Sequence, residues 1–549
     1  MSRSDLVLFV VGILLFASGF SPLALMRLQT PFETFTATTI DNVLIRYDVT
    51  KKVSTAFDAP LAILLHGFSG NRVMMRMIAL ALAESGFICA SVDLRGHGSS
   101  EGVMGGRDDF VKDIQAVILS LREKGLGDPT RIVLLGHSMG GGVVLNPKSQ
   151  VKGVVATIGV TPVSFPEWVN TTTPKNLLLI ISTGDTVINA MDVKQTFYKA
   201  VNGTREFNET HNIHGTARKL FVIEGVNHLN ILYNEAVISE IVAWSTKYVF
   251  GEAQALTSNP NQTHAATYVS LAGGTLLTLA VLSLVHGKLW PKKRAIDVRV
   301  GVNRKALMKT GFTATLLAGI LGSLLALVIA FALMLVTPFF VANIITALFL
   351  GNAIILGGLA WTRLRQGQTG FSYMRFVKES IKRSSIKVDV CFGLIGAAAL
   401  TGLLSLTIGS NTTATFSIAS MRLIALPLYT FVFSVVFLFY ESFFKGWVRP
   451  MIGDGGARMI YSMSFQLVVL VSIFMLELVI LTTILSLFMP YIQVEFFFLG
   501  LNLVLMSLGI ATVSAEVFFE RTGGWIAQII ISAFTFAALI IVFSPTLYL

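Results

Sequence analysis

Hydrophobic residues divide this 549-residue chain into three regions of different character. Residues 6–25 are almost continuously apolar, and residues 32–250 alternate short apolar runs with helix-like segments. Beyond residue 263 long apolar stretches dominate the chain. Short apolar runs that alternate with helical patterns predict parallel strands joined by helices, whereas stretches of about 20 apolar residues can cross a bilayer. The pattern therefore predicts one α/β domain joined to an all-helical transmembrane bundle.

The first apolar segment follows a short polar start, Ser2-Arg3-Ser4-Asp5. A cleaved secretory signal peptide is one interpretation, with Ala17-Ser18-Gly19 as the cleavage site. The segment is about 20 residues long, which is enough to span a bilayer and is longer than the usual apolar part of a signal peptide. We therefore expect residues 1–27 to form an uncleaved N-terminal transmembrane signal anchor.

The polar region contains short apolar runs with the length of buried strands. The six runs lie at 61–65, 87–92, 132–135, 154–160, 177–181 and 220–223. Before them, residues 36–49 alternate in the manner of an antiparallel hairpin at a sheet edge. Because helix-like segments separate the runs, we expect residues 32–250 to form a single domain with a mostly parallel sheet and flanking helices.

Residues 251–549 are predicted to form a membrane domain of about eight transmembrane helices. The predicted spans lie near 266–287, 311–336, 339–361, 390–409, 420–444, 460–487, 494–517 and 524–546. The loops after the first, third and fifth spans are rich in Lys and Arg, whereas the turns at 337–338, 411–413 and 490–491 contain neither. The positive-inside rule makes the basic loops cytoplasmic. We therefore expect a multi-pass protein of the cell membrane with an extracytoplasmic α/β domain.

Potential glycosylation sites agree with this orientation. Five tripeptides match the acceptor pattern for N-linked glycosylation, and they begin at Asn170, Asn202, Asn208, Asn261 and Asn411. All five fall on the side that the loop charges assign as external. The pattern is common by chance, so it supports the orientation without establishing it.

Composition narrows the classes of partner. The chain is 53% hydrophobic and 13% charged, with a net charge of +11. Residues 28–250 contain 20 Lys and Arg against 20 Asp and Glu, so the whole basic excess lies in the membrane region. A basic excess there reports orientation, and we expect no nucleic-acid partner. Cys89 and Cys391 are far apart in the chain and are expected to be unpaired core thiols.

The candidate chemistry begins at Gly136-His137-Ser138-Met139-Gly140, which follows the apolar run at 132–135. This sequence fits the G-x-S-x-G pattern, in which a serine lies on a sharp turn between a strand and a helix. The flanking glycines are required because the strained turn leaves no room for side chains. A serine hydroxyl also needs a base to take its proton and an acid to orient that base.

Both partners follow the serine in the expected order. Asp185 comes just after the run at 177–181, and His228 comes just after the run at 220–223. The order Ser138, Asp185, His228 is typical of this strand arrangement, and open α/β sheets place their sites at the carboxyl ends of strands. Asp93 is a rival acid, but it precedes the serine.

With these motifs in place, residues 60–248 resemble an α/β-hydrolase of the serine esterase and monoacylglycerol-lipase-like kind. His66-Gly67-Phe68-Ser69-Gly70 resembles the oxyanion loop of that group, and residues 93–100 (Asp-Leu-Arg-Gly-His-Gly-Ser-Ser) resemble the loop after its next strand. The resemblance implies that the backbone N–H groups of Phe68 and Met139 form the oxyanion hole.

The sequence departs from that group in three respects. The helix after Ser138 is short, because Pro147 ends it after about two turns. Ser182 and Asn227 stand where glycines are often found. Only residues 161–176 separate two of the predicted strands, so there is no room for the cap domain that lipases of this group generally carry.

Other histidines and aromatic residues have structural interpretations. His66 and His97 are expected to stabilise loops by hydrogen bonding, and His137 is expected to pack within the turn. Since His, Asp and Glu do not cluster at metal-ligand spacing, we expect neither a metal nor a cofactor. Residues 161–176, which include Phe165 and Trp168, form either an interfacial membrane contact or an ordinary aromatic loop.

Three ionisable residues fall in the outer halves of the predicted spans, namely Arg422, Glu477 and Glu495. Charged residues inside a bilayer are costly and are functional candidates by default. They could form a polar pocket for a lipid head group or a transported molecule. The alternative is a structural Arg–Glu pair or side chains that extend to the interface.

Together these features predict a membrane-anchored serine hydrolase that cleaves an ester, most simply a lipid or lipid-linked acyl group. An acyltransferase or peptidase would use the same three residues. The alternative from another class is a domain that binds a ligand without turnover on a transporter or signalling bundle. Membrane lipids are the expected partners, and the sequence leaves the oligomeric state open.

Overall fold

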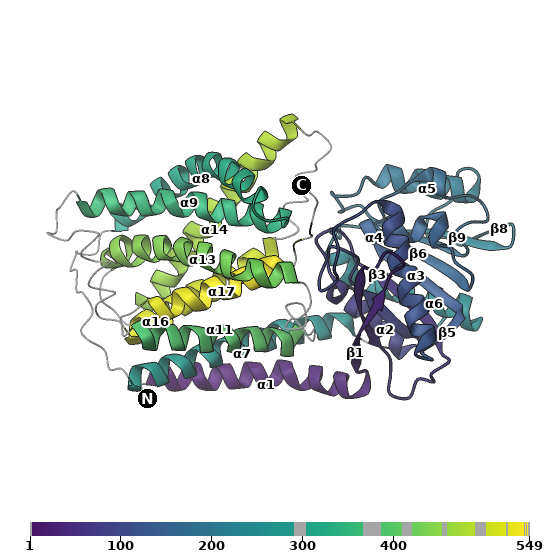
Figure 1. The fold of residues 1–549 in the computed structure, drawn as a ribbon, viewed down its shortest axis with the longest axis horizontal. Coiled ribbons are helices and arrows are strands. Elements are labelled where there is room, and N and C mark those ends of the chain that lie inside the picture. Colours follow the sequence, from purple (N-terminus) through teal and green to yellow (C-terminus); the bar gives the residue numbers. More distant parts are fainter. Residues whose placement is uncertain are drawn as a thin grey trace.

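The computed structural model describes residues 3–257, 259–289, 304–365, 386–408, 420–452, 458–488, 501–522 and 525–542, together with Ser544 and Thr546. Figure 1 shows two bodies side by side: an α/β domain and a helical domain made of α1 and all helices from α7 onward. Their buried apolar side chains form separate clusters, so each domain has its own core. The division follows the change from short to long apolar runs along the chain.

A nine-stranded sheet forms the centre of the α/β domain, in the order β1-β2-β4-β3-β5-β6-β7-β9-β8. The strands are β1 (Phe32–Thr38), β2 (Leu44–Thr50), β3 (Pro60–Leu65), β4 (Ile88–Val92), β5 (Asp128–His137), β6 (Val154–Val160), β7 (Leu177–Ser182), β8 (His211–Ile213) and β9 (Thr216–Ile223). The six central strands, β4, β3, β5, β6, β7 and β9, are mutually parallel. At the two edges of the sheet, β1, β2 and β8 pair antiparallel with their neighbours.

Alternate residues of each strand face opposite helical layers, as the pleat of a strand requires. In β3, Ala62 and Leu64 join the core beneath α2 (Arg76–Glu84) and α6 (Glu235–Phe250). Leu61 and Ile63 join the opposite core. The helices of that face are α3 (Arg107–Glu123), α4 (Met139–Leu145) and α5 (Ala190–Val201). Burial on both faces explains why the strands are continuous apolar runs.

The helical domain consists, among the described residues, of nine long helices. They are α1 (Arg3–Gln29), α7 (Pro260–Leu289), α8 (Arg304–Met334), α9 (Phe340–Arg365), α11 (Ile386–Ile408), α13 (Ser420–Phe443), α14 (Arg458–Phe488), α16 (Leu501–Thr522) and α17 (Ile526–Val542). Seven of these helices, α1 to α14 in this list, contain described segments long and apolar enough to cross a bilayer, and α16 and α17 contain shorter apolar segments. Such helices suggest a membrane protein.

The α/β domain is attached at both of its ends to one pair of helices, since α1 precedes it and α7 follows it (Figure 1). These two helices pack along each other at glycine positions. A Cβ at Gly12 would lie 3.0 Å from the backbone of Leu277, and one at Gly19 would lie 2.6 Å from the carbonyl of Ala266. Small residues allow such close helix contact inside a bilayer. The pairing fixes where the α/β domain enters and leaves the bundle.

Several sequence predictions can be compared directly with this fold. The edge hairpin at 36–49 is confirmed as β1 and β2, and the mostly parallel sheet is confirmed. Residues 161–176 contain only a 3-10 turn, η3 (Pro166–Trp168), so the predicted absence of a cap helix is also confirmed. The short strand β8 was not predicted, because its polar residues carry no apolar run. Both cysteines are free, but Cys391 is exposed on its helix and is not a core thiol.

Candidate active site

Ser138 lies at the turn between β5 and α4, where the backbone adopts a left-handed conformation with φ 54° and ψ −115°. The glycines on either side make this turn sterically feasible. A Cβ at Gly140 would lie 2.6 Å from the carbonyl oxygens of Leu65 and His66, and one at Gly136 would collide with the carbonyl of Gly140. Strained backbone of this kind persists only where the surroundings enforce it. The Ser138 side chain is 8% exposed at the N-terminus of α4.

The predicted acid and base contact each other at the carboxyl ends of neighbouring strands. His228 Nδ1 lies 2.7 Å from Asp185 Oδ2, and both side chains are buried. The other oxygen of Asp185 accepts hydrogen bonds from the backbone N–H groups of Val187 and Ile188, at 2.9 and 3.1 Å. A carboxylate held in this way orients the imidazole with Nδ1–H toward the acid, which leaves Nε2 as the basic nitrogen.

His137 connects the serine turn to the histidine loop. Its Nε2–H donates to the carbonyl oxygen of His228 at 2.9 Å, and the two rings pack with their centroids 4.6 Å apart. Burial, together with the neighbouring His228, keeps the pKa of His137 well below its usual value, so the ring is neutral and can serve as this donor. The prediction that His137 packs within the turn is confirmed, but its hydrogen bond could not be derived from sequence spacing.

The loop after β3 passes directly against the serine. A Cβ at Gly67 would lie 3.0 Å from Ser138 Cβ, which shows how closely the two backbones approach. His66 stabilises this loop from beneath: its Nδ1 pairs with the carbonyl of Gly67 at 2.7 Å and its Nε2 accepts from the N–H of Leu94 at 3.1 Å. The structural interpretation of His66 is therefore confirmed. Met139, the other predicted oxyanion donor, is the first residue of α4.

Asp93 is engaged elsewhere and does not contact His228. Its carboxylate forms an ion pair with Arg72 and accepts from the N–H of Ser99 at 2.7 Å. The rival assignment of Asp93 as the orienting acid is therefore wrong. The pattern alone could not exclude it, because the ion pair joins residues 21 positions apart.

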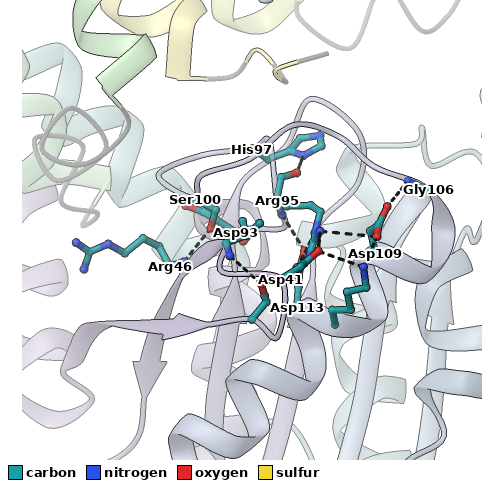
Figure 2. Close-up of polar contacts among 12 residues, drawn as sticks. Asp41, Arg46, Asp93, Arg95, His97, Ser100, Gly106, Asp109 and Asp113 are labelled. Carbon is teal, nitrogen blue, oxygen red and sulfur yellow. Dashed lines mark hydrogen bonds and ion pairs between the residues drawn. The ribbon is translucent and has the colours of Figure 1, made fainter. Parts of the chain in front are cut away.

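A network of charged residues holds the loop at 93–100 in place (Figure 2). Arg95 Nε donates to Asp113 Oδ1 at 2.8 Å, and its Nη1 donates to Asp41 Oδ2 at 2.8 Å. Ser100 Oγ donates to the carbonyl of Asp93 at 2.6 Å and accepts from the N–H of Arg46 at 2.8 Å. Arg95 and its hydrogen bonds hold the pKa of Asp41 far below its usual value. The loop is thus rigidly attached to the sheet.

The segment that replaces a cap is packed against α3. The guanidinium of Arg107 lies over the rings of Phe165 and Trp168, at 3.7 and 5.4 Å from their centroids, and the two rings are 4.5 Å apart. Both aromatic side chains are partly buried. This contact favours the ordinary aromatic loop over a free interfacial anchor.

Of the three ionisable residues of the predicted polar pocket, the structure describes Arg422 and Glu477. Arg422 is buried at the start of α13 and donates to the carbonyls of Gly96 and Ser544, at 3.1 and 3.3 Å. Glu477 is buried in α14 and accepts from Asn352 Nδ2 at 3.0 Å. Glu495 lies outside the described residues. The two described side chains thus have different partners, and the predicted polar pocket and the alternative of an Arg–Glu pair both stay predictions.

The potential glycosylation sites differ in what can be described. Asn170, Asn202 and Asn208 are exposed on the α/β domain. Asn261 lies in the first turn of α7, and Asn411 lies outside the described residues. Among the described residues, no group of three or more His, Cys, Asp or Glu side chains is arranged to hold a metal ion.

Part of the chain is similar to known proteins. Residues 59–196 match the family model described as Hydrolase_4, serine aminopeptidase, S33. An uncharacterized 31.7 kDa protein in the traX-finO intergenic region of Escherichia coli is 38% identical over 105 residues, which cover 18% of this chain and 37% of that protein. The quorum-quenching protein AidA of Acinetobacter baumannii is 33% identical over 121 residues, which cover 21% and 38% of the two chains.

The chain thus spans just over a third of the length of these curated relatives. Among solved structures, the Pyrococcus furiosus esterase Pf2001 is similar with a TM-score of 0.34 and 20% identity, covering 40% of this chain and 94% of the esterase. The family match includes the strands from β3 to β7, Ser138 and Asp185. With the sheet order and the family match together, the α/β domain has the α/β-hydrolase fold, and the match supports its assignment as a hydrolase.

Proposed function

We propose that this protein is a membrane-anchored serine hydrolase that cleaves an ester of a lipid or a lipid-linked acyl group. The observation that supports this most directly is the 2.7 Å contact between His228 Nδ1 and Asp185 Oδ2, next to a serine on a strained turn. Three such residues, at the carboxyl ends of the parallel strands β5, β7 and β9, are the parts required for acyl transfer to a serine.

In the proposed reaction, Ser138 Oγ attacks the ester carbonyl while His228 Nε2 takes the hydroxyl proton. Asp185 orients the imidazole and stabilises the imidazolium that forms. The backbone N–H groups of Phe68 and Met139 hold the developing oxyanion. His228 then gives the proton to the leaving alcohol, and a water molecule activated by the same histidine releases the acid from the acyl-enzyme.

The substrate class is proposed from the surroundings of the site. Between β6 and β7 a 3-10 turn takes the place of the cap helices that cover many lipase sites. The loop at 93–100, at the same edge of the sheet as Ser138, contacts the helical domain through Gly96. A water-insoluble ester that diffuses in the bilayer could reach such a site along this boundary, whereas a fully soluble substrate would gain nothing from it.

An external location of the α/β domain is proposed from the helix ends. α7 leaves the α/β domain and ends near Lys288, and α8 returns from Arg304. Lys387 lies in the first turn of α11 and Arg458 begins α14, so basic residues gather at these helix ends, which we place on the side away from the α/β domain. Positive charge marks the cytoplasmic side.

Labelling of intact cells tests this location. Lys175 is exposed on the α/β domain, so an impermeant maleimide should label the variant Lys175→Cys in a Cys391→Ser background.

A peptidase is the second candidate, because the matching family model is described as a serine aminopeptidase. The same nucleophile, base and acid would cleave an amide if the leaving amine were protonated. The two candidates are separated by the rates at which one preparation hydrolyses three kinds of substrate. These are short p-nitrophenyl esters, monoacylglycerols in mixed micelles and aminoacyl p-nitroanilides. We expect turnover of the esters and at most a small fraction of that rate with the anilides.

Covalent labelling with a fluorophosphonate tests the proposed nucleophile. The wild-type chain should be labelled, and Ser138→Ala should not. Ser149→Ala is the matched control, because Ser149 is also a buried serine just beyond α4 but donates only to the carbonyl of Val143. If the folded wild-type chain is not labelled, the catalytic proposal fails and the domain binds a ligand without turnover.

A further inference from the structure

The helical domain contacts the α/β domain at one carbonyl oxygen of the loop at 93–100. The carbonyl of Gly96 accepts from Thr546 N–H at 2.8 Å, from Thr546 Oγ1 at 3.0 Å and from Arg422 Nη2 at 3.1 Å. The carbonyl of Thr546 in turn accepts from the N–H of Met104 at 2.8 Å. A carbonyl oxygen has two lone pairs, so three donors saturate Gly96. We call Arg422 and Thr546, with their bonds to Gly96 and Met104, the junction clamp.

The clamp is anchored in the helical domain. Arg422 is 2% exposed, and the same Nη2 that binds Gly96 donates to the carbonyl of Ser544 at 3.3 Å. Ser544 Oγ accepts from the N–H of Ala342 in α9 at 3.1 Å, and Thr546 forms a β-bridge with Phe339. The position of the clamp therefore depends on the positions of α9 and α13, and the clamp connects these helices to the loop at 93–100.

Gly96 cannot move away from the clamp without a change in its surroundings. Its φ is +75°, a conformation that favours glycine, and a Cβ there would lie 3.1 Å from the carbonyl of Thr546. On the other side, Arg95 is fixed by its ion pairs with Asp41 and Asp113. Arg95 and Gly96 are thus both held in place, and His97 follows them directly in the chain.

His97 transmits this constraint to the oxyanion loop. It is fully buried, with its Nδ1 hydrogen-bonded to the carbonyl of Arg95 at 3.0 Å. Its ring packs 5.1 Å from that of His66 and edge-on at 6.1 Å from that of Phe68. Figure 2 shows His97 at the crest of the loop, on the side of the green and yellow helices. Side chains in such close packing cannot shift independently.

We propose that Arg422 and Thr546 of the helical domain are positioning residues for the hydrolase reaction. Through Gly96 and His97 they hold Phe68, and with it the proposed oxyanion donor, in the geometry that the transition state requires. The inference rests on the proposed function and goes beyond it, because it makes the helical domain part of the active machinery and not only an anchor. A donor that is displaced by a fraction of an ångström loses much of its effect on a developing oxyanion.

The predicted signature is a loss of kcat with little change in KM. An oxyanion donor acts mainly on the transition state, so its displacement should not weaken binding of a short soluble ester. We expect the double variant Arg422→Met/Thr546→Val to lose about 30-fold in kcat, which is less than the 10²–10³ seen when such a donor is removed outright. KM should change by less than about twofold.

The structure offers a matched control at the opposite edge of the sheet. Arg218 is also fully buried and also donates to two backbone carbonyls, those of Ala217 and Asn170. Thr216 Oγ1, like Thr546 Oγ1, donates to a carbonyl oxygen. Both control residues lie at the start of β9, whereas the active site is at the strands' carboxyl ends. The variant Arg218→Met/Thr216→Val should keep kcat within about twofold of wild type.

The full-length chain is used throughout, and the melting temperature of each variant is measured in the same detergent. Two milder single variants test the inference if the double variant does not fold. Thr546→Val keeps the N–H donor and should lower kcat about threefold, and Arg422→Lys should recover most of the activity lost in Arg422→Met.

The outcomes distinguish this inference from the proposed function. If wild type neither hydrolyses esters nor reacts with a fluorophosphonate, the proposed function fails. If wild type is active and the folded clamp variants have the same kcat, with or without a changed KM, the positioning role is overturned. If the control double variant loses as much kcat as the clamp variant, the effect is general destabilisation and the inference is likewise overturned.

Discussion

The two domains bury their polar side chains in different ways. In the α/β domain, His228 contacts Asp185, and His137, the neighbour of Ser138, donates to the carbonyl of His228, so loops that are far apart in sequence are joined at one edge of the sheet. In the helical domain, the described buried groups Glu477, Glu516 and His286 belong to separate clusters, each confined to a few neighbouring helices. Linked loops of this kind can bring catalytic groups together, whereas isolated clusters join helices locally. We therefore propose that the chemistry belongs to the α/β domain and that the helical domain acts on it through the junction.

The largest effect on activity is expected from substitutions of Ser138 and Asp185. Ser138→Ala should lower kcat by at least about 10⁴-fold, and Asp185→Asn should lower it by about 10⁴-fold because the imidazole loses the acid that fixes its tautomer. KM for a short ester should change little. Steady-state hydrolysis of p-nitrophenyl butyrate measures both, and a variant of Asp185 that keeps a tenth of wild-type activity would remove this residue from the site.

A backbone change at the serine turn should reduce both activity and stability. A Cβ at Gly136 would collide with the carbonyl of Gly140, so Gly136→Ala should cost about 1–3 kcal/mol or more and misplace Ser138. Gly106→Ala is the control, since a Cβ there meets only Asp109 Oδ2 at 3.7 Å, an ordinary contact. Melting temperature and ester hydrolysis are measured together. Equal behaviour of the two variants would contradict the steric account of the turn.

Two buried glutamates test the local clusters of the helical domain. Glu516 binds Arg449 at 2.9 Å and also pairs with Lys445, so Glu516→Gln leaves buried cations short of a partner and should cost about 3–5 kcal/mol. Glu477 has a hydrogen bond from Asn352 and no ion pair among the described residues, so Glu477→Gln should cost less than about 1 kcal/mol. Thermal unfolding in detergent ranks the pair, and the reverse order would refute this interpretation.

The stability of the α/β domain should also depend on pH. Burial lowers the pKa of His66, His97 and His137 below the usual value, so all three are neutral in the folded chain. The unfolded chain gains protons on them as the pH falls below about 6.5, so stability should decrease in that range by up to about 1.4 kcal/mol per pH unit for each histidine. Melting temperatures from pH 8 to 5 measure the slope. His137→Gln should reduce it, and a slope that does not change would contradict the assignment of neutral rings.

Local patterns allowed the α/β domain to be predicted almost completely. Burial on both faces makes each central strand an apolar run, and Ser138, Asp185 and His228 stand at fixed offsets from such runs. The polar edge strand β8 has no such run and was missed. The fate of Asp93 was also undetermined, because an acidic residue after a strand looks the same whether it meets a histidine or Arg72.

The junction could not be derived from sequence at all. Its bonds join Gly96 to Arg422 and Thr546, which lie 326 and 450 positions further along the chain. The acceptor is a backbone carbonyl, which every residue possesses, so no residue type marks it. Arg422 was recognised as unusual because a charge at the end of an apolar span is costly, but its partner is visible only in three dimensions.

In the proposed reaction, Ser138 carries the acyl group during turnover. Wild-type protein mixed with a p-nitrophenyl ester should release about one equivalent of p-nitrophenol in a rapid burst if deacylation is slow, and acid quenching followed by peptide mass spectrometry should locate the acyl mass on Ser138. His228→Gln and Ser138→Ala should show no such adduct. An acyl group on another residue, or steady hydrolysis by Ser138→Ala at the wild-type rate, would contradict the account.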